Sequence, residues 1–278
     1  MLKVLIMAVA IFVGMIAYDH MDTPQKNTPP DSAAARQEEK RQQQMESRAV
    51  KGIFLTLLPD KSEWPEPFQK AWLAFNMEEA VEPLRESPDW VPLDAIPRDM
   101  QHALIAIEDH DFYNHGAIAV DGIIRAALVN ISAGEVVQGG STLTQQFVKN
   151  VFLTHEQSME RKIEEAVLSL MLEDKYSKDE ILELYLNTTY FGAGADGLKQ
   201  AAMVYFNKSP QALTLAEAAI IASLPYAPSA LNPLENPAGC KKRQLLVLDA
   251  MQRYGFINQE QAAEARAEKV QLANGTWM

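Results

Sequence analysis

Apolar residues recur at helical spacing along most of the chain, whereas strand-like alternation is sparse. Pro97 opens a segment whose apolar side carries Met100, Ala103, Leu104 and Ile107. The same periodicity predicts helices over residues 142–152, 158–175, 178–186, 215–223 and 241–254. Only the piece at 53–58 has a strand-like composition, and a proline-rich loop is expected between 225 and 237. The pattern therefore predicts a mainly α fold.

The first 50 residues differ in composition from the rest. An apolar run from Val4 to Tyr18 follows Lys3, precedes two acidic residues and has no small-residue cleavage site after it. This favours an uncleaved transmembrane helix over 1–18 with a cytoplasmic N-terminus. A cleaved signal peptide and a core helix are the alternatives, because a typical span needs about 20 residues. Residues 19–50 have the composition of a linker, and 51–278 that of a globular domain.

Composition narrows the classes of partner. The formal net charge of -12 argues against nucleic acid as a partner, since a polyanion requires an excess of cations. An anionic substrate would need the basic residues gathered at its site. Cys240 is the single cysteine, so an internal disulfide and a cysteine metal cluster are both excluded.

The first candidate for chemistry is Glu108 with Asp109, at the end of the helix that Pro97 opens. A helix C-terminus disfavours negative charge, and Ile107 and Phe112 are apolar neighbours. A carboxyl group there would have a raised pKa, which suits acid–base chemistry. By itself, however, the segment is better explained as an ordinary solvated helix end with a histidine-containing turn.

The second candidate is the stretch from Gly139 to Gln146. Its Thr142-x-x-Gln145 pattern predicts a capping box, and a helix start after two glycines is also a natural phosphate site. Thr142, Gln146 and Lys149 are spaced to share one helix face. A hydroxyl, an amide and an ammonium in line suit a sugar phosphate. The alternative is that the segment only caps the helix and binds no ligand.

The third candidate is Arg161 with Glu165, an i, i+4 pair. Leu168 and Leu172 continue the stripe that carries Glu165, so its carboxylate is expected near an apolar face with a cationic partner. A surface ion pair is the alternative.

Together these segments resemble the ordered motifs of the peptidoglycan glycosyltransferase family, which comprises the transglycosylase domains of class A penicillin-binding proteins and the monofunctional transglycosylases. The resemblance covers about residues 92–266. The matching positions, in chain order, are Glu108, Asp109, Phe112 and His115; Gly139 to Gln146, with Ser141, Thr142, Gln145 and Gln146; Arg161, Lys162 and Glu165; Lys178 to Asn187, with Tyr185; and Arg243.

A few positions depart from the family pattern. Ala117 stands where a glycine is usual, and Gln244 where a second basic residue is common. Asn207 replaces a usual glycine, and asparagine tolerates the left-handed backbone that such a position implies.

The resemblance implies a lysozyme-like larger lobe with a smaller membrane-facing lobe, and polymerisation of lipid II into β-1,4-linked glycan. Glu108 would be the general base and Glu165 a second catalytic carboxylate, orienting cations or holding a divalent cation such as Mg or Mn. The residues implied in substrate binding are Asp109, Phe112, His115, Ser141, Thr142, Gln145, Gln146, Lys149, Arg161, Lys162, Tyr185, Asn187 and Arg243. Among them, Asp109 is expected mainly to support the loop.

The expected location is a bacterial inner membrane, crossed once, with the catalytic domain on the outer face. Expected partners are lipid II, the growing glycan chain, that membrane and other cell-wall synthesis proteins. No S-x-x-K, S-D-N or K-T-G motif occurs, so the monofunctional type without transpeptidase activity is expected. Two alternatives remain, a lysozyme-like muramidase and a non-catalytic cell-wall scaffold.

Overall fold

The structure, a computed structural model, describes residues 66–119, 122, 140–153 and 158–278. The chain divides between Leu73 and Ala74 into two compact units. The expected anchor at 1–18, the linker at 19–50 and the strand at 53–58 all lie outside the described residues. Among the residues that are described, no helix is both long enough and apolar enough to cross a membrane.

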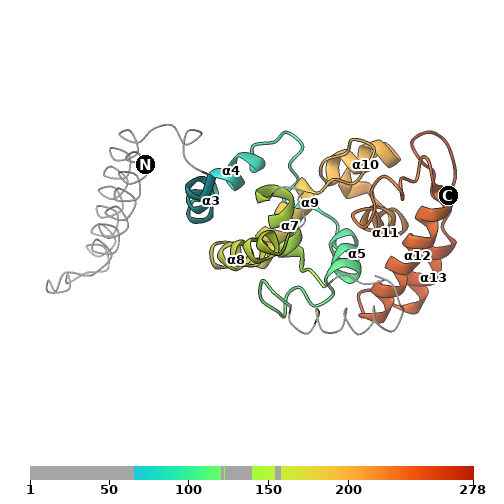
Figure 1. The fold of residues 1–278 in the computed structure, drawn as a ribbon. Helices are drawn as coiled ribbons and strands as arrows, with labels where there is room; N and C mark the ends of the chain where they lie inside the picture. Colours follow the sequence, from blue (N-terminus) through green and yellow to red (C-terminus); the bar gives the residue numbers. More distant parts are fainter. Residues whose placement is uncertain (1–65, 120–121, 123–139, 154–157) are drawn as a thin grey trace, which may run out of the picture. The chain divides into compact units, whose positions relative to one another are not determined.

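The described part of the chain is helical, and its only extended pairings are two isolated bridges, Tyr190 with Asp196 and Gln271 with Trp277 (Figure 1). The helices are α3 (Glu66–Phe75), α4 (Glu78–Arg85), η2 (Leu93–Ala95), α5 (Arg98–Glu108), α7 (Leu143–Phe152), α8 (Met159–Lys175), α9 (Lys178–Thr188), α10 (Leu198–Phe206), η3 (Pro210–Ala212), α11 (Leu215–Ser223), α12 (Pro237–Arg253) and α13 (Gln259–Ala267). The prediction of a mainly α fold is confirmed.

Side-chain caps explain why several helices begin where the sequence predicted. Thr142, Ser158, Ser177 and Thr214 accept backbone N–H groups at the starts of α7, α8, α9 and α11. α12 begins at Pro237 rather than at Lys241, because the Asn236 side chain caps it and proline suits the first turn.

Four α-helices of the described chain were not predicted: α3, α4, α10 and α13. α10 follows Gly197, which has no capping side chain; a Cβ there would lie 2.4 Å from the carbonyl oxygen of Asn187. The helix ends at Asn207 in the left-handed conformation, at φ 53°, as the sequence indicated. α13 is rich in alanine, glutamate and glutamine, so its apolar periodicity is weak.

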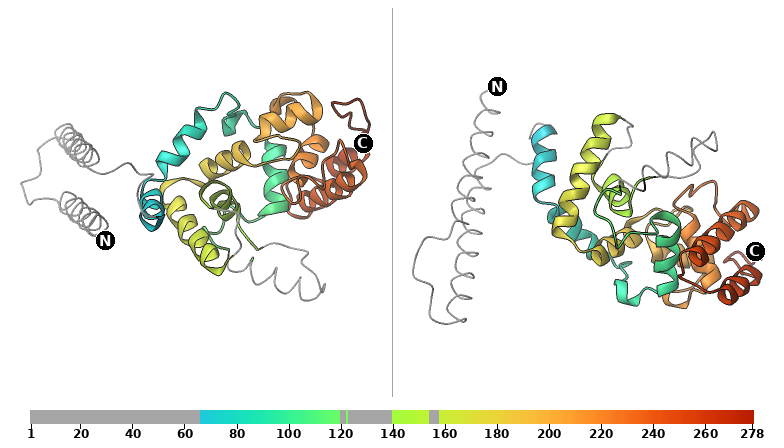
Figure 2. Two further views of the ribbon diagram at one scale, coloured as in Figure 1. Left: turned by 45° about the horizontal axis from the view of Figure 1, so that its top comes forward. Right: turned by 90° about the horizontal axis from the view of Figure 1, so that it is seen from below.

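The centre of the larger unit is α11, which packs against α5 and α12. Every residue from Ala216 to Ser223 is buried, and its alanines allow the neighbouring helices to approach closely. α13 packs on α12, and the two are the adjacent red helices in Figure 2. Met100, Ala103 and Leu104 of α5 are fully buried, as their spacing predicted. This packing fixes the C-terminal end of α5.

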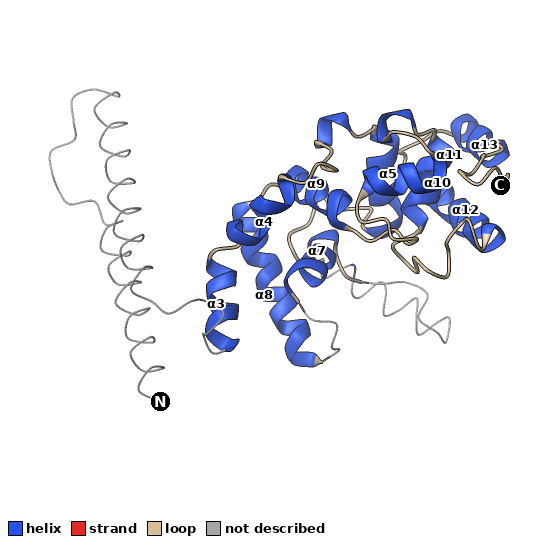
Figure 3. Ribbon diagram, turned by 90° about the horizontal axis from the view of Figure 1, so that it is seen from above, coloured by secondary structure: helices blue, strands red, loops and turns tan. Residues whose placement is uncertain are grey.

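α7 contacts both α8 and α9, as Figure 3 shows from above. Phe147 of α7, Leu172 of α8 and Leu182 of α9 are fully buried within the same hydrophobic core. The packing of α7 against both helices thereby connects α8 to α9.

Candidate active site

Glu108 is the last residue of α5, and its surroundings perturb its acidity. Burial raises the pKa of the Glu108 carboxyl group above its ordinary value, and the nearby Asp109 charge adds to the rise. A hydrogen bond from Gln146 and the charges of Arg243 and Lys149 lower that pKa, without cancelling the rise. A carboxyl group with a raised pKa suits proton transfer near neutral pH.

Gln146 connects Glu108 to α9. Its Nε2 atom donates to Oε2 of Glu108 at 2.9 Å, and its Oε1 atom accepts from the Tyr185 hydroxyl at 2.9 Å. An amide turned the other way would set its oxygen against the carboxylate. Burial, followed by the Glu108 charge, holds the pKa of Tyr185 well above its usual value, so that the hydroxyl keeps its proton.

Asp109 ties the loop after α5 to the start of α7. Its Oδ1 atom lies 2.6 Å from Nε2 of His115, and its Oδ2 atom accepts the backbone N–H of Leu143 at 3.0 Å. Nδ1 of His115 lies 2.6 Å from the carbonyl oxygen of Gly116. Both carboxylate oxygens are therefore used within the fold, which positions α7 beside the end of α5.

Glu165 is buried on α8 between two cations. Its Oε1 atom pairs with the Lys162 ammonium, and Oε2 lies 3.5 Å from the Arg161 guanidinium. Lys162 also donates to Oγ of Ser141 at 3.1 Å, which connects α8 to the loop before α7. The sequence predicted a buried carboxylate with a cationic partner, and the structure confirms this with Lys162 as a second partner.

Thr142 and Gln145 form the predicted capping box, which is confirmed. The Thr142 hydroxyl accepts the backbone N–H of Gln145 at 3.1 Å and donates to the carbonyl oxygen of Ala117 at 2.8 Å. Thr142 is buried, Gln146 reaches Glu108, and Lys149 is exposed. Of the three residues, Thr142 is used within the fold, Gln146 contacts Glu108, and Lys149 faces solvent.

Phe112 and Asn187 support the site from within the fold. Phe112 is fully buried, with the Lys178 ammonium 4.5 Å from its ring centroid. The Asn187 side chain accepts from the backbone N–H of Val91 at 2.8 Å and donates to the carbonyl oxygen of the same residue at 2.9 Å.

Arg243 and Lys149 bring positive charge to Glu108 from two helices. Arg243 lies on α12, with its guanidinium carbon 4.1 Å from the Tyr226 ring centroid, and Lys149 lies in the last turn of α7. Within the described residues, the buried Nε atoms of Arg243 and Arg161 have no hydrogen-bond partner. An unpaired buried donor is costly unless a ligand accepts from it, so both guanidinium groups suit an anionic ligand.

Sequence reasoning missed a network around Glu173. Its Oε1 atom accepts from the Thr144 hydroxyl at 2.5 Å and from the Lys178 ammonium at 2.7 Å. The contacts join α7, α8 and α9 across the turn at Tyr176 and Ser177. Helical spacing does not predict a pair that crosses a turn, although Lys178 stands in a motif.

A divalent cation does not fit Glu165 as the structure presents it. Both carboxylate oxygens face cationic groups, and the described residues contain no cluster of three potential metal-ligating acids, histidines or cysteines. A metal ion needs several such ligands. In the structure, Arg161 and Lys162 supply the positive charge beside Glu165.

A mainly helical fold that sets a carboxyl group of raised pKa near cationic side chains defines a candidate acid–base site suited to an anionic ligand. A family model described as transglycosylase matches residues 76–252, well over half of the chain. The chain belongs to the transglycosylase family.

Relatives agree with this assignment. Penicillin-binding protein 1A of Rickettsia conorii is 48% identical over 186 residues, which are 66% of this chain and 24% of that protein. The Aquifex aeolicus protein of the same name is 48% identical over 176 residues, covering 63% and 24%. The chain thus spans about a quarter of the length of these relatives.

A Cupriavidus necator protein named as a putative transglycosylase is 43% identical over 194 residues, covering 70% of this chain and 84% of that one. Among solved structures, penicillin-binding protein 1A from Haemophilus influenzae shares 34% identity over 47% of this chain and 16% of that one, with a TM-score of 0.33.

Proposed function

We propose that this chain is a peptidoglycan glycosyltransferase that polymerises lipid II into β-1,4-linked glycan strands with inversion. The observation that carries the proposal is the raised pKa of Glu108, in a carboxyl group held by Gln146 and influenced by Lys149 and Arg243. Family membership supports the same reaction class.

In the proposed reaction, the 4-hydroxyl oxygen of the acceptor sugar forms a bond to the anomeric carbon of the donor. The proton of that hydroxyl passes to Glu108, and the bond from the anomeric carbon to the diphosphate oxygen breaks. The diphosphate leaves with the electron pair, still attached to its lipid. Glu108 must be ionised to accept the proton, and its raised pKa makes it a stronger base than an ordinary carboxylate.

The leaving diphosphate gains negative charge as its bond breaks, so cations at the site lower the barrier. Lys149 and Arg243 already influence Glu108, and the Nε atoms of Arg243 and Arg161 have no partner within the described residues. We assign these three side chains to the diphosphate. Glu165 orients Arg161 and Lys162, since its two carboxylate oxygens face these two cations.

Contact with a lipid is supported by an apolar stripe on α8, formed by Met159, Ile163, Val167 and Leu170. These four side chains are 50–78% exposed and recur at helical spacing along one side of the helix. An exposed contiguous apolar face favours a membrane or lipid partner. We therefore propose that α8 lies against the bilayer that holds the lipid carrier, on the outer face of the inner membrane, with residues 1–18 as the anchor.

Purified protein incubated with lipid II, with products resolved on a gel, tests this function. Polymeric glycan and released undecaprenyl diphosphate are expected. Shortening of preformed glycan would indicate a muramidase, and no turnover of either substrate would indicate a scaffold.

A further inference from the structure

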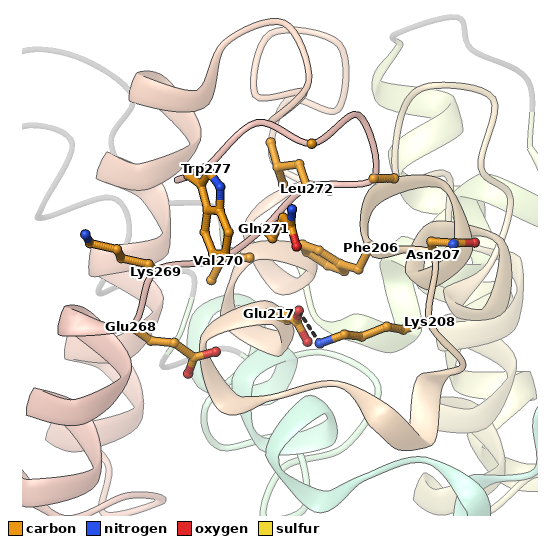
Figure 4. A pocket seen from close by; sticks show the side chains of 12 residues that line it. Phe206, Asn207, Lys208, Glu217, Glu268, Lys269, Val270, Gln271, Leu272 and Trp277 are labelled. Carbon is orange, nitrogen blue, oxygen red and sulfur yellow. Dashed lines mark hydrogen bonds and ion pairs between the residues drawn. The ribbon is translucent and has the colours of Figure 1, made fainter.

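A pocket of about 380 Å³ opens between the end of α10, the start of α11 and the segment that follows α13 (Figure 4). In that view Trp277 and Lys269 lie on one side, with Asn207 and Lys208 on the other. None of its lining residues belongs to the acid–base site described above. Its volume is in the range of small-ligand pockets.

Backbone hydrogen bonds hold the Trp277 side of this pocket in place. Gln271 and Trp277 form an antiparallel bridge, and Val270 exchanges two backbone hydrogen bonds with Met278, at 3.0 and 2.8 Å. The N–H of Ala273 donates to the carbonyl oxygen of Tyr205 at 2.8 Å, which fastens the segment to α10. The Trp277 side chain is nevertheless 59% exposed, so the fold presents an aromatic face to solvent instead of burying it.

The charged side chains of the pocket balance one another. Lys208 pairs with the buried Glu217 at 2.7 Å, and the other Glu217 oxygen accepts the N–H of Thr214. One Glu268 oxygen accepts the Thr214 hydroxyl at 2.7 Å. With Lys269, the lining holds two cations and two carboxylates. A lining without net charge favours an uncharged ligand. A charged ligand would meet as many charges of its own sign as of the opposite sign, so it would gain little net attraction.

Uncommitted polar groups surround the aromatic face. Among the described residues, the side chains of Asn207, Lys269 and Gln271 have no hydrogen-bond partner, and all three are exposed. Amides both donate and accept, and an ammonium donates, so together they match the hydroxyl and acetamido groups of a sugar. The C–H face of a pyranose ring stacks on an indole, which supplies the apolar contact.

We propose that this pocket is a second, non-catalytic saccharide site that takes one or two uncharged N-acetylhexosamine rings of a glycan strand. The saccharide class follows from the lining itself, and only its assignment to the growing glycan depends on the proposed function.

The test measures binding directly, with a tetramer of β-1,4-linked N-acetylglucosamine as the probe. The indole N–H signal of Trp277 is assigned by its loss in Trp277→Phe, and its shift is followed as the tetramer is added to the full chain. A saturable shift is expected. Affinity at this site should fall about tenfold or more in Trp277→Ala, the usual scale for truncating an aromatic anchor, while Trp277→Phe keeps most of it, as judged by saturation-transfer signals from the sugar.

Leu246→Ala is the matched control, because Leu246 is a similarly exposed apolar side chain on α12 outside the pocket and its loss should leave binding unchanged. An unmoved Trp277 signal, equal binding by Trp277→Ala, or a shift caused by inorganic phosphate at lower concentration than by the tetramer would each overturn the proposal. Lipid II polymerisation is measured on the same samples. Tetramer binding at Trp277 without polymerisation would refute the proposed function alone, and polymerisation without such binding would refute the pocket alone.

Discussion

Gln146 donates a 2.9 Å hydrogen bond to the Glu108 carboxylate across 38 positions of sequence. The bond joins α7 to the end of α5, and the Tyr185 hydroxyl on α9 fixes the opposite end of the same amide. Because this bond favours the ionised form, it opposes the effect of burial on Glu108. The basicity of the proposed catalytic carboxylate thus depends on how α5, α7 and α9 pack together, and on the Arg243 charge from α12.

Glu108→Gln should reduce lipid II polymerisation by about 10²–10⁴-fold, because it removes the proton acceptor and little volume. The fold favours the protonated form of Glu108, whose pKa is raised, so ionisation lowers stability as pH rises through that pKa. Glutamine does not ionise, and the melting temperature at higher pH should be equal to or above that of the wild type. Turnover within tenfold of wild type would refute the assignment.

Tyr185→Phe should move the acid limb of the kcat/KM profile to higher pH. Without the hydroxyl, the Gln146 amide is free to turn, and a hydrogen bond that lowers the Glu108 pKa is weakened. Since the base must be ionised, its activity then begins at higher pH.

Tyr205→Phe is the control for that experiment. Tyr205 is also buried, and its hydroxyl donates to the carbonyl oxygen of Phe191 at 2.9 Å instead of to the site. Its loss should lower the melting temperature without moving the acid limb. If both variants leave the limb in place, Tyr185 does not act through Gln146.

Lys149→Ala should severely reduce the initial polymerisation rate while the melting temperature changes little, because an exposed ammonium contributes little to folding. Removing its charge should also raise the pKa of Glu108 further, so the remaining activity should have an acid limb at higher pH. Lys199→Ala, which breaks an exposed ion pair with Asp89, should change neither quantity. Full activity in Lys149→Ala would mean that the diphosphate lies elsewhere.

Glu165→Gln should lower both stability and polymerisation. Its buried carboxylate neutralises Arg161 and Lys162, and weakening such a pair typically costs about 1–3 kcal/mol in the free energy of unfolding. Glu160→Gln, an exposed position in the first turn of α8, should stay within about 0.5 kcal/mol of wild type. Chemical denaturation measures both. A stable, fully active Glu165→Gln would exclude a positioning role.

Labelled penicillin should form no covalent adduct with these 278 residues, because they contain no S-x-x-K motif to supply the nucleophile. A diphosphate-mimicking glycolipid such as moenomycin should bind and raise the melting temperature. Mass spectrometry after incubation with the antibiotic reports acylation directly, and an adduct would contradict the expectation.

Local sequence determined much of the helical framework. Thr142 with Gln145 and Thr214 with Glu217 carry their capping signals within four residues, so the starts of α7 and α11 are encoded where they occur. Asn207 likewise encodes its own left-handed turn. The motifs also singled out Glu108 and Glu165, because their residue types and spacing are specific to a family.

Only the tertiary structure decided what these side chains contact. The bonds from Gln146 to Glu108 and from Leu143 to Asp109, and the contact of Lys178 with Glu173, depend on how α5, α7, α8 and α9 pack. The position of the Trp277 ring opposite Asn207 depends on a backbone hydrogen bond from Ala273 to Tyr205, which are far apart in sequence. Short-range interactions fix where a helix begins, whereas the packing of the whole core decides which atoms meet across helices. The spacing of apolar residues along the chain does not predict those contacts.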